Sequence, residues 1–250
     1  MKILKSFIFT IWFYIVVVSL ILFYGGINLI IVKIMFKKNP EKAIRRMEKV
    51  LKRFGKIVFK VAFSKVQVDG IENIPKDKPY VIVGNHQSFF DIPLIYAEIG
   101  VPSFIAKKEL TKAPIVKSYL DLSKSVFIDR KDVKSGAAAL RRISKLIKDK
   151  GVVCIFPEGT RTSDGNLLEF KSGTLMIPYR YNVPIVPIAI DGNYKLNRKK
   201  SCLFNSGDVK LTILPSVIPE NFASEDELRN VIRKDIDKHI LIRENKDEKN

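Results

Sequence analysis

The chain has 250 residues, of which 46% are hydrophobic and 28% are charged, so it can bury a substantial core and is not a disordered segment. Its two cysteines, Cys154 and Cys202, are too few and too far apart for a disulfide framework or a structural zinc site, and they are typical of a reducing compartment. The net charge of +18 indicates an anionic partner: nucleic acid, a phospholipid surface or a phosphorylated substrate.

The first predicted element is an uncharged, apolar segment at residues 6–32. As a helix it would be about 40 Å long, more than the roughly 30 Å hydrocarbon core of a bilayer. This length favours a membrane helix over a cleaved signal peptide, whose apolar region has about 7 to 15 residues and ends at a small-residue cleavage site. Gly25 and Gly26 divide the segment, so a spanning helix and one that turns back within a leaflet both fit the pattern.

A basic amphipathic helix is predicted to follow, within residues 33–65. This stretch has twelve Lys and Arg side chains against two Glu, and by the positive-inside rule it lies on the cytoplasmic side. We predict that the helix lies at the headgroup level of a membrane; the alternative is a solvated helix whose apolar stripe packs on the domain core. That stripe recurs at three- to four-residue spacing: Ile44, Met47, Leu51, Phe54, Val58 and Val61.

From residue 66 onward the pattern is that of an α/β domain. Short apolar runs predict five strands, at residues 80–83, 103–106, 125–128, 152–156 and 185–190. Because helical stretches alternate with these strands, we expect a mixed, largely parallel central sheet flanked by helices, preceded by the N-terminal membrane-associated helical segment.

Helical periodicity in this domain is clearest at residues 134–148, where Leu140, Ile143, Leu146 and Ile147 share one face. A capping box, Ser224-x-x-Glu227, predicts a final helix that ends at about Arg243. The predicted organisation is therefore a membrane anchor with a basic amphipathic helix (1–65), an α/β domain (66–243) and a charged tail (244–250).

His86 and Asp91 follow the first of these predicted strands, with four residues between them. An imidazole can take a proton at neutral pH, and a carboxylate on its other ring nitrogen fixes the tautomer and stabilises the imidazolium, so such a pair can activate a hydroxyl or a water. On one regular helix the two side chains would point about 140° apart. We therefore place His86 in the turn after the strand and Asp91 at the start of the next helix, where Asp91 can also act as a helix cap. Ser88 lacks the Gly-x-Ser-x-Gly elbow of a serine nucleophile.

Charged residues follow the next three predicted strands as well. Lys107 and Arg130 belong to charge clusters that either are simply solvated or bind a phosphate. After the fourth strand comes Phe-Pro-Glu-Gly-Thr-Arg, in which Gly159 lets the backbone approach a ligand and Arg161 offers planar donors suited to an anion. Phe-Lys-Ser-Gly at 170–173 repeats the combination of a cation and a glycine. In open α/β sheets ligands bind at the ends of strands, so these residues are candidates for one site.

Four segments together resemble the ordered blocks of the glycerolipid acyltransferases of the PlsC type. They are Asn-His-Gln-Ser-x-x-Asp at 85–91, Val-Phe-Ile-Asp-Arg at 126–130, Phe-Pro-Glu-Gly-Thr-Arg at 156–161 and Val-Pro-Ile-Val-Pro at 183–187. The resemblance covers residues 67–191, about half of the chain. The chain departs from it at Lys124, where many members have glycine, and at Thr162, where serine is common.

The resemblance implies a lysophosphatidate acyltransferase, a membrane enzyme of phospholipid biosynthesis. Such an enzyme moves a fatty acyl group from a thioester of coenzyme A or acyl carrier protein to the free hydroxyl of lysophosphatidic acid, giving phosphatidic acid. It implies no metal or further cofactor, and its partners would be membrane phospholipid, the lysophospholipid acceptor and the acyl donor. The residues that it implies are His86 as general base, Asp91 as the group that orients it, Glu158, Gly159, Thr160 and Arg161 around the acceptor, and Lys107 and Arg130 on its phosphate.

Two other hypotheses fit the same residues. One is a related acyltransferase that acts on another lysolipid. The other is a non-catalytic, basic binding module at the membrane surface. Nucleic acid is the less favoured anion, because no recognised nucleic-acid-binding motif is present and the positive charge concentrates beside the apolar segment.

Overall fold

The structure of the chain is a computed structural model, and it describes residues 2–77, 79–129 and 132–241. Its α-helices, with one π-helical segment, are α1 (Lys2–Ser19), η1 (Leu20–Gly25, π-helical), α2 (Gly26–Lys38), α3 (Pro40–Val61), α4 (Asp91–Glu98), α5 (Pro114–Leu122), α6 (Val133–Lys148), α7 (Met176–Arg180), α8 (Asn193–Leu196) and α9 (Glu225–Leu241). Short 3-10 helices are η2 (Ile71–Asn73), η3 (Lys108–Lys112) and η4 (Pro219–Asn221). The strands are β1 (Val66–Asp69), β2 (Val81–Gly84), β3 (Ser103–Lys107), β4 (Val126–Ile128), β5 (Val153–Ile155), β6 (Ile185–Asp191) and β7 (Val209–Ile213).

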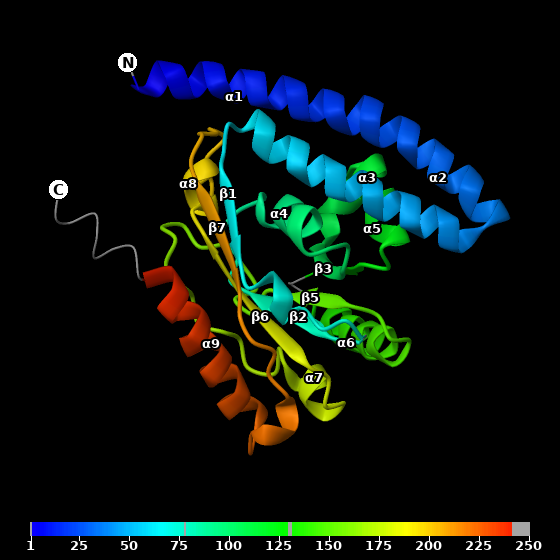
Figure 1. Cartoon of the computed structure of the whole chain (residues 1–250), viewed down its shortest axis with the longest axis vertical. Helices are drawn as coiled ribbons and strands as arrows, with labels where there is room; N and C mark the ends of the chain where they lie inside the picture. Colours follow the sequence, from blue (N-terminus) through cyan, green and yellow to red (C-terminus); the bar gives the residue numbers. More distant parts are fainter. Residues whose placement is uncertain (1, 78, 130–131, 242–250) are drawn as a thin grey trace.

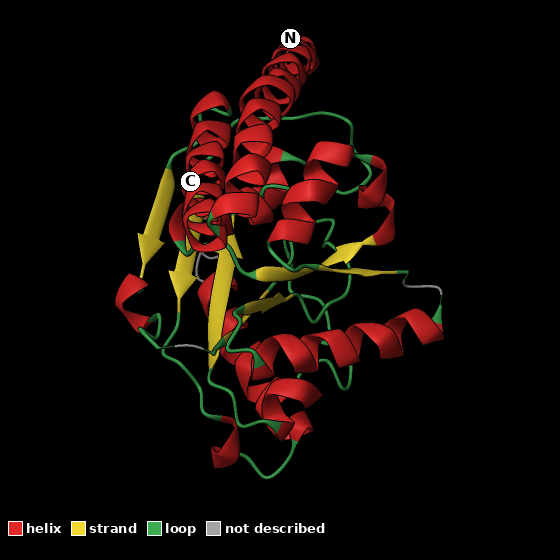
Figure 2. Cartoon of the chain, turned by 90° about the vertical axis from the view of Figure 1, so that its right-hand side faces the viewer, coloured by secondary structure: helices red, strands yellow, loops and turns green. Residues whose placement is uncertain are grey.

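Within the described residues the strands form one seven-stranded sheet in the order β1-β7-β6-β2-β5-β3-β4. Neighbouring strands in it are parallel, except that β6 and β7 are antiparallel. Helices lie on both sides of the sheet (Figures 1 and 2), so the predicted fold class is confirmed. Because β2, β3, β4, β5 and β6 all point the same way, their carboxyl ends meet at one edge of the sheet.

The sheet separates two apolar cores. Side chains alternate between the faces of a strand, so Ile82 of β2 packs in the core with α3 and α4, whereas Val81 and Val83 pack in the core with α6 and α9. Strands that are buried on both faces are continuous apolar runs in a sequence. This is why all five predicted strands are present, each within two residues of its predicted ends.

The strands β1 and β7 are absent from the sequence prediction. β1 lies at the edge of the sheet and is only partly buried, and β7 alternates buried with half-buried residues, so neither has a continuous apolar run. β1 begins at Val66, the residue at which we predict that the α/β domain begins.

The helices of the domain follow the predicted pattern with two differences. In α6, Ile143, Leu146 and Ile147 are buried as expected, but Leu140 is exposed and lines the cavity described below. At the start of α9, Ser224 Oγ accepts from Glu227 N as the capping box predicts. The Glu227 carboxylate accepts from Ala223 N, one residue earlier than the motif implies. The structure describes α9 to Leu241, and the predicted end of this helix and the charged tail (244–250) lie outside the described residues.

At the N-terminus, α1, η1 and α2 form one continuous helix that runs beside α3 (Figure 1). Among the described residues, Leu4–Lys38 is the helix that is long and apolar enough to cross a membrane. Thr10, Phe13, Leu29 and Val32 are buried against the rest of the protein. The opposite side of the helix is an exposed apolar face: Leu4, Phe7, Ile8, Ile11, Trp12, Tyr14, Ile15, Val18, Leu22, Phe23, Ile27, Ile30, Ile34 and Phe36.

The helix α3 is amphipathic as predicted, and most of its apolar stripe packs on protein, although Ile44 is exposed. Met47, Leu51 and Val58 are buried between α3 and its neighbours α2 and α4. Most of the stripe thus packs as in the alternative interpretation, while the position of α3 at the headgroup level stays a prediction. Cationic side chains of α3 remain exposed: Lys42, Arg45, Lys49, Lys52, Arg53, Lys56 and Lys60.

The close packing of α3 on α4 depends on Gly55. A Cβ atom at this position would lie 2.2 Å from the Pro93 carbonyl oxygen and 3.0 Å from the Ala97 amide nitrogen, and neither backbone atom can move aside easily. We expect Gly55→Ala to lower the free energy of unfolding by about 1–3 kcal/mol, measured by urea denaturation of the full chain in detergent.

The matched control is Gly136→Ala in α6, because a Cβ atom there has no heavy atom within 4 Å. This control should leave the stability unchanged or raise it by up to about 1 kcal/mol, the usual preference of a helix interior for alanine. Equal stability of the Gly55→Ala variant and the parent protein would contradict the packing described.

Candidate active site

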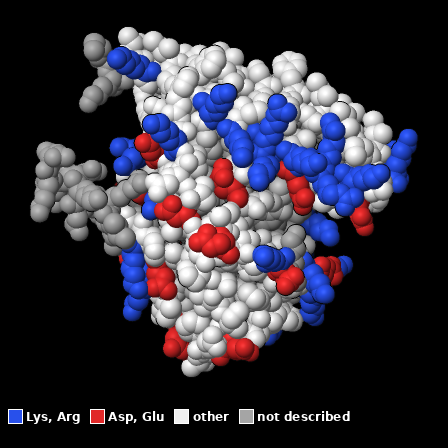
Figure 3. Space-filling model, in the orientation of Figure 1, with Lys and Arg blue, Asp and Glu red and all other residues white. Residues whose placement is uncertain are grey.

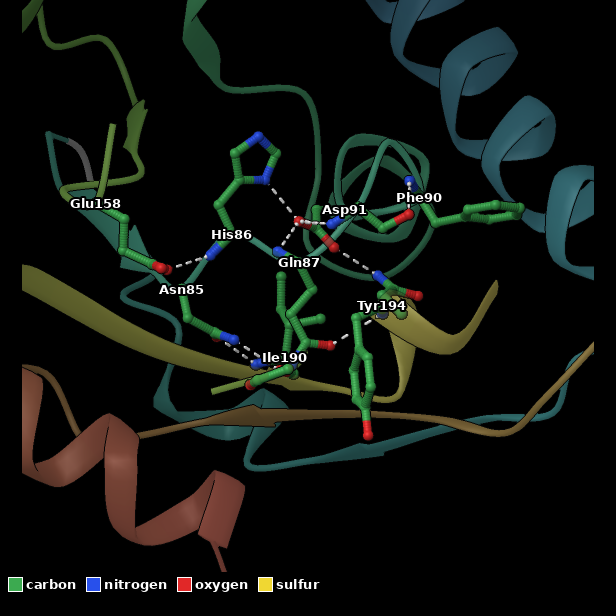
Figure 4. Close-up of polar contacts among 11 residues, drawn as sticks. Asn85, His86, Gln87, Phe90, Asp91, Glu158, Ile190 and Tyr194 are labelled. Carbon is green, nitrogen blue, oxygen red and sulfur yellow. Dashed lines mark hydrogen bonds and ion pairs between the residues drawn. The ribbon is translucent and has the colours of Figure 1, made fainter. Parts of the chain in front are cut away.

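The turn between β2 and α4 carries His86, and a side chain that extends the sheet fixes where this turn begins. Asn85 Nδ2 donates to the Ile190 carbonyl oxygen at 2.8 Å, and Asn85 Oδ1 accepts from Ile190 N at 2.7 Å (Figure 4). The Asn85 side-chain amide thus makes the two hydrogen bonds that one more paired residue of β2 would make with β6. Gln87 anchors the turn further along, since its Nε2 donates to the Gly165 carbonyl oxygen and its Oε1 accepts from Tyr194 N.

His86 and Asp91 form the predicted pair. The His86 Nδ1 atom lies 2.6 Å from Asp91 Oδ2, and the Asp91 side chain is fully buried, whereas that of His86 is 18% exposed (Figure 4). The same carboxylate oxygen accepts from Gln87 N at 2.7 Å and from Ser88 N at 2.9 Å. Since an ionised carboxylate can only accept, Nδ1 carries the ring proton and Nε2 is the basic atom.

Asp91 does not cap α4. It is the first residue of that helix, and among the described residues its carboxylate bonds to the turn before the helix and to Asn193, not to the amides of the helix's first turn. Ser88 is fully buried and its hydroxyl accepts from Phe90 N at 3.3 Å, so the structure agrees with our exclusion of Ser88 as a nucleophile.

Two residues that the sequence analysis missed complete the surroundings of this pair. Asn193 Nδ2 donates to Asp91 Oδ1 at 2.7 Å, and the Phe156 ring stacks on the imidazole with centroids 4.4 Å apart. Both residues follow the carboxyl end of a strand, β6 and β5 respectively, so the criterion that found His86 could also have found them.

The loop after β5 is hydrogen-bonded to both the backbone N–H and the carbonyl oxygen of His86. Glu158 Oε1 accepts from His86 N at 2.6 Å (Figure 4), and Thr162 N donates to the His86 carbonyl oxygen at 2.9 Å. Glu158 Oε2 accepts from Leu168 N at 3.1 Å. Glu158 is only 2% exposed and is not among the described residues that line the cavity, so it shapes the site by holding backbone and does not face a substrate. Burial raises the pKa of Glu158 to about 7.

Arg161 provides the cation of this loop. Its guanidinium lies 3.8 Å from the centre of the Phe89 ring, and its Nη1 atom is buried without a hydrogen-bond partner in the structure. Burial lowers the pKa of Arg161. A buried donor without an acceptor costs free energy, which an anionic ligand would offset. Gly159 and Thr160 line the cavity beside Arg161.

The two other predicted phosphate ligands lie at the ends of β3 and β4. Lys107 lines the cavity, but its Nζ atom is 2.8 Å from Glu109 Oε1, so its charge already has a partner. Arg130 lies outside the described residues.

A cavity of about 970 Å³ opens at this edge of the sheet. His86, Arg161 and Lys107 belong to its polar part, and the remainder is mostly apolar and reaches beneath the N-terminal helix. Its apolar lining includes Ile21, Tyr24, Leu51, Phe54, Ile115, Tyr119, Leu140 and Ile143. A base, an unpartnered guanidinium and a long apolar cavity together define a site for an enzyme that activates the hydroxyl of an amphipathic anion.

Comparison with known proteins agrees with this class. A family model described as Acyltransferase matches residues 65–191, and the chain belongs to this acyltransferase family. The crystal structure of PlsC, the 1-acyl-sn-glycerophosphate (LPA) acyltransferase of Thermotoga maritima, matches with a TM-score of 0.87 and 37% sequence identity, covering 96% of this chain and 97% of that chain.

Curated relatives include the 1-acyl-sn-glycerol-3-phosphate acyltransferase of Borreliella burgdorferi, 32% identical over 74% of this chain and 75% of that protein. The chloroplastic BAT2 enzyme of Brassica napus is 37% identical over 60% of this chain and 44% of its own length. The human 1-acyl-sn-glycerol-3-phosphate acyltransferase alpha is 34% identical over 65% of this chain and 58% of its own length. The chain thus spans about half the length of the last two relatives.

The raised pKa of Glu158 predicts a pH dependence of stability. The folded protein binds this proton more tightly than the unfolded chain, so the stability that it contributes is present at acid pH and is lost as the pH rises through about 7. We expect the free energy of unfolding of the parent protein to fall between pH 5 and pH 8 more steeply than that of Glu158→Gln, whose side chain does not ionise.

The control for this prediction is Glu72→Gln, which changes an exposed carboxylate. Urea denaturation at each pH should give this control the slope of the parent protein. Identical slopes for the parent protein and Glu158→Gln would show that Glu158 titrates as an ordinary surface group.

Proposed function

We propose that the chain transfers a fatty acyl group from an acyl thioester to the free hydroxyl of lysophosphatidic acid, which gives phosphatidic acid. The observation that carries the proposal is the His86–Asp91 pair beside the unpartnered guanidinium of Arg161 at the polar end of an apolar cavity. The relatives compared above are named 1-acyl-sn-glycerol-3-phosphate or LPA acyltransferases, which supports the choice of acceptor.

In the proposed reaction, His86 Nε2 removes the proton of the acceptor hydroxyl as its oxygen attacks the thioester carbonyl carbon. The tetrahedral intermediate then collapses, the carbon–sulfur bond breaks, and the thiolate takes the proton from the imidazolium. Asp91 stabilises the imidazolium between these two steps. The proposed reaction has no acyl-enzyme, because the Ser88 hydroxyl in the same turn is buried and bonded to Phe90 N.

Substrate binding follows from the two ends of the cavity. Arg161 binds the phosphate of the acceptor through charge-assisted hydrogen bonds and so brings the hydroxyl to His86, while the apolar part accepts a fatty chain. The donor in this proposal is a thioester of coenzyme A or acyl carrier protein. The histidine base needs no further cofactor or metal ion.

The N-terminal helix indicates association with a membrane, and its packing favours a position within one leaflet. It contacts the domain along its length: Ser6 bonds with Asn205, Thr10 with Phe204, and the Gly25 carbonyl oxygen with Tyr119. The distance from Ser6 to Gly25 is about 30 Å along the axis, the thickness of a hydrocarbon core. If this helix crossed the bilayer perpendicular to its plane, the polar domain that it contacts over this length would have to enter the lipid.

In this arrangement the exposed apolar face enters the bilayer and the cations of α3 lie near the headgroups. Figure 3 shows Lys and Arg side chains gathered over α3. The anionic lipids of the cytoplasmic leaflet would attract this basic face, so we propose that the catalytic domain lies on the cytoplasmic side.

Exchange of the catalytic residues tests the proposed activity. We expect His86→Ala and Asp91→Asn each to lower kcat about 100- to 10,000-fold, because one removes the base and the other removes the carboxylate that orients it. Release of free thiol from an acyl thioester, in the presence and absence of lysophosphatidic acid, measures the transfer.

Ser88→Ala is the matched control in the same turn, and it should keep kcat within about tenfold of the parent value because the hydroxyl only accepts from Phe90 N. Thiol release that needs no acceptor would contradict the proposal. Thiol release with a different lysolipid, and not with lysophosphatidic acid, would show that the acceptor is that other lysolipid. Lipid binding without thiol release would favour a non-catalytic binding module.

The proposed orientation is tested through Cys202, which is exposed, whereas Cys154 is buried. A membrane-impermeant maleimide should label the protein in inside-out vesicles and not in intact cells. Cys202→Ser should remove the label from the inside-out vesicles. Labelling in intact cells would place the domain on the opposite side of the membrane.

A further inference from the structure

Lys171 lies against the loop that carries Arg161. Its backbone N–H donates to the Pro157 carbonyl oxygen at 3.0 Å, and its side chain crosses over Gly159. A Cβ atom built on Gly159 would lie 2.9 Å from both Cε and Nζ of Lys171. The positive φ of 67° favours glycine at position 159, and a Cβ atom there would displace the end of the Lys171 side chain. Lys171 lines the same cavity as Arg161 and His86.

The segment that carries Lys171 is hydrogen-bonded to Glu225, the first residue of α9. The Glu225 carboxylate accepts from Gly173 N at 3.4 Å and from Leu175 N at 3.1 Å, and Arg229 pairs with it at 2.5 Å. Glu225 is only 5% exposed, so these bonds are shielded from solvent. Lys171 therefore projects from a fixed backbone, which limits the positions that its ammonium group can reach.

The ammonium group of Lys171 has no ion-pair partner among the described residues. Lys107, which also lines the cavity, is paired with Glu109. Three cations without an ion-pair partner among the described residues thus line one mostly apolar cavity: Arg161, Lys199 and the exposed Lys171. Like charges in such surroundings repel, and an anion with two charges relieves that repulsion better than an anion with one.

We propose that Lys171 is the second cation of the acceptor phosphate site, and that with Arg161 it selects a phosphomonoester over a phosphodiester. This inference rests on the proposed function. A phosphomonoester carries close to two negative charges at neutral pH and exposes three acceptor oxygens, whereas a diester carries one charge and exposes two. Lysophosphatidic acid carries its phosphate as a monoester, whereas lysophospholipids with a choline or ethanolamine headgroup carry a diester.

The test is Lys171→Gln in the full-length protein, with Lys171→Arg as the conservative variant. We expect Lys171→Gln to raise the KM for lysophosphatidic acid about tenfold and to change kcat less than about threefold, since the ammonium binds phosphate and takes no part in proton transfer. Lys171→Arg should recover most of the affinity. Lys145→Gln is the matched control, because Lys145 is an exposed lysine of α6 that does not line the cavity.

Selectivity is measured with methyl phosphate and dimethyl phosphate as competitors of the acceptor. Methyl phosphate should inhibit the parent protein more strongly than dimethyl phosphate, and Lys171→Gln should weaken inhibition by methyl phosphate about tenfold while leaving dimethyl phosphate within twofold. A KM within twofold of the parent value, a fall in kcat alone, or equal weakening of both competitors would each overturn the inference.

Failure of the proposed function gives a different result. If the parent protein does not acylate lysophosphatidic acid, the proposed activity is wrong, and titration calorimetry with methyl phosphate still decides the role of Lys171. Binding that is weakened about tenfold by Lys171→Gln, and restored by Lys171→Arg, would support the phosphate site. Equal binding by the parent protein and Lys171→Gln would overturn it.

Discussion

The buried carboxylate of Asp91 is the interaction on which the site depends. It accepts from the His86 ring, from the amides of Gln87 and Ser88, and from the side chain of Asn193. A charge that is removed from water is very costly unless such donors surround it. The bonds that make this burial tolerable are also the bonds that close the turn after β2 and direct the imidazole. Local folding and the orientation of the base are therefore set by the same contacts.

The remaining parts of the site are attached to this turn through backbone. Glu158 and Thr162 bond the two sides of His86, so the loop that carries the guanidinium keeps a fixed distance from the base. The cavity connects both to the membrane-facing part of the protein, because the N-terminal helix covers its apolar end and is joined to α5 by the bond between Tyr119 and Gly25. A lipid in this cavity would therefore contact the anchor and the base at the same time.

Sequence patterns predicted the elements and strand ends that follow from local composition. They missed the contacts between residues that are far apart in the chain. Strands with two buried faces were visible as apolar runs, and parallel strand ends brought His86 and Arg161 to one cavity as expected. The bond between Asn193 and Asp91 joins residues 102 positions apart and exists only because β6 pairs with β2. For α3, periodicity gave the apolar face but could not identify the helices that cover it. Resemblance placed Glu158 at the site, yet only the fold shows that its carboxylate points to backbone.

The π-helical turn of η1 sets the rotational phase between the two halves of the N-terminal helix. Side chains on an α-helix advance about 100° per residue, so two residues 19 positions apart would point about 100° away from each other. A π-helical turn takes up one additional residue and returns such a pair to the same side. Thr10 and Leu29, like Phe13 and Val32, have this separation and are all buried. An insertion or deletion of one residue in this turn would swing Phe13 away from the domain, so chimaeras that exchange α1 between homologues must conserve the length of this bulge.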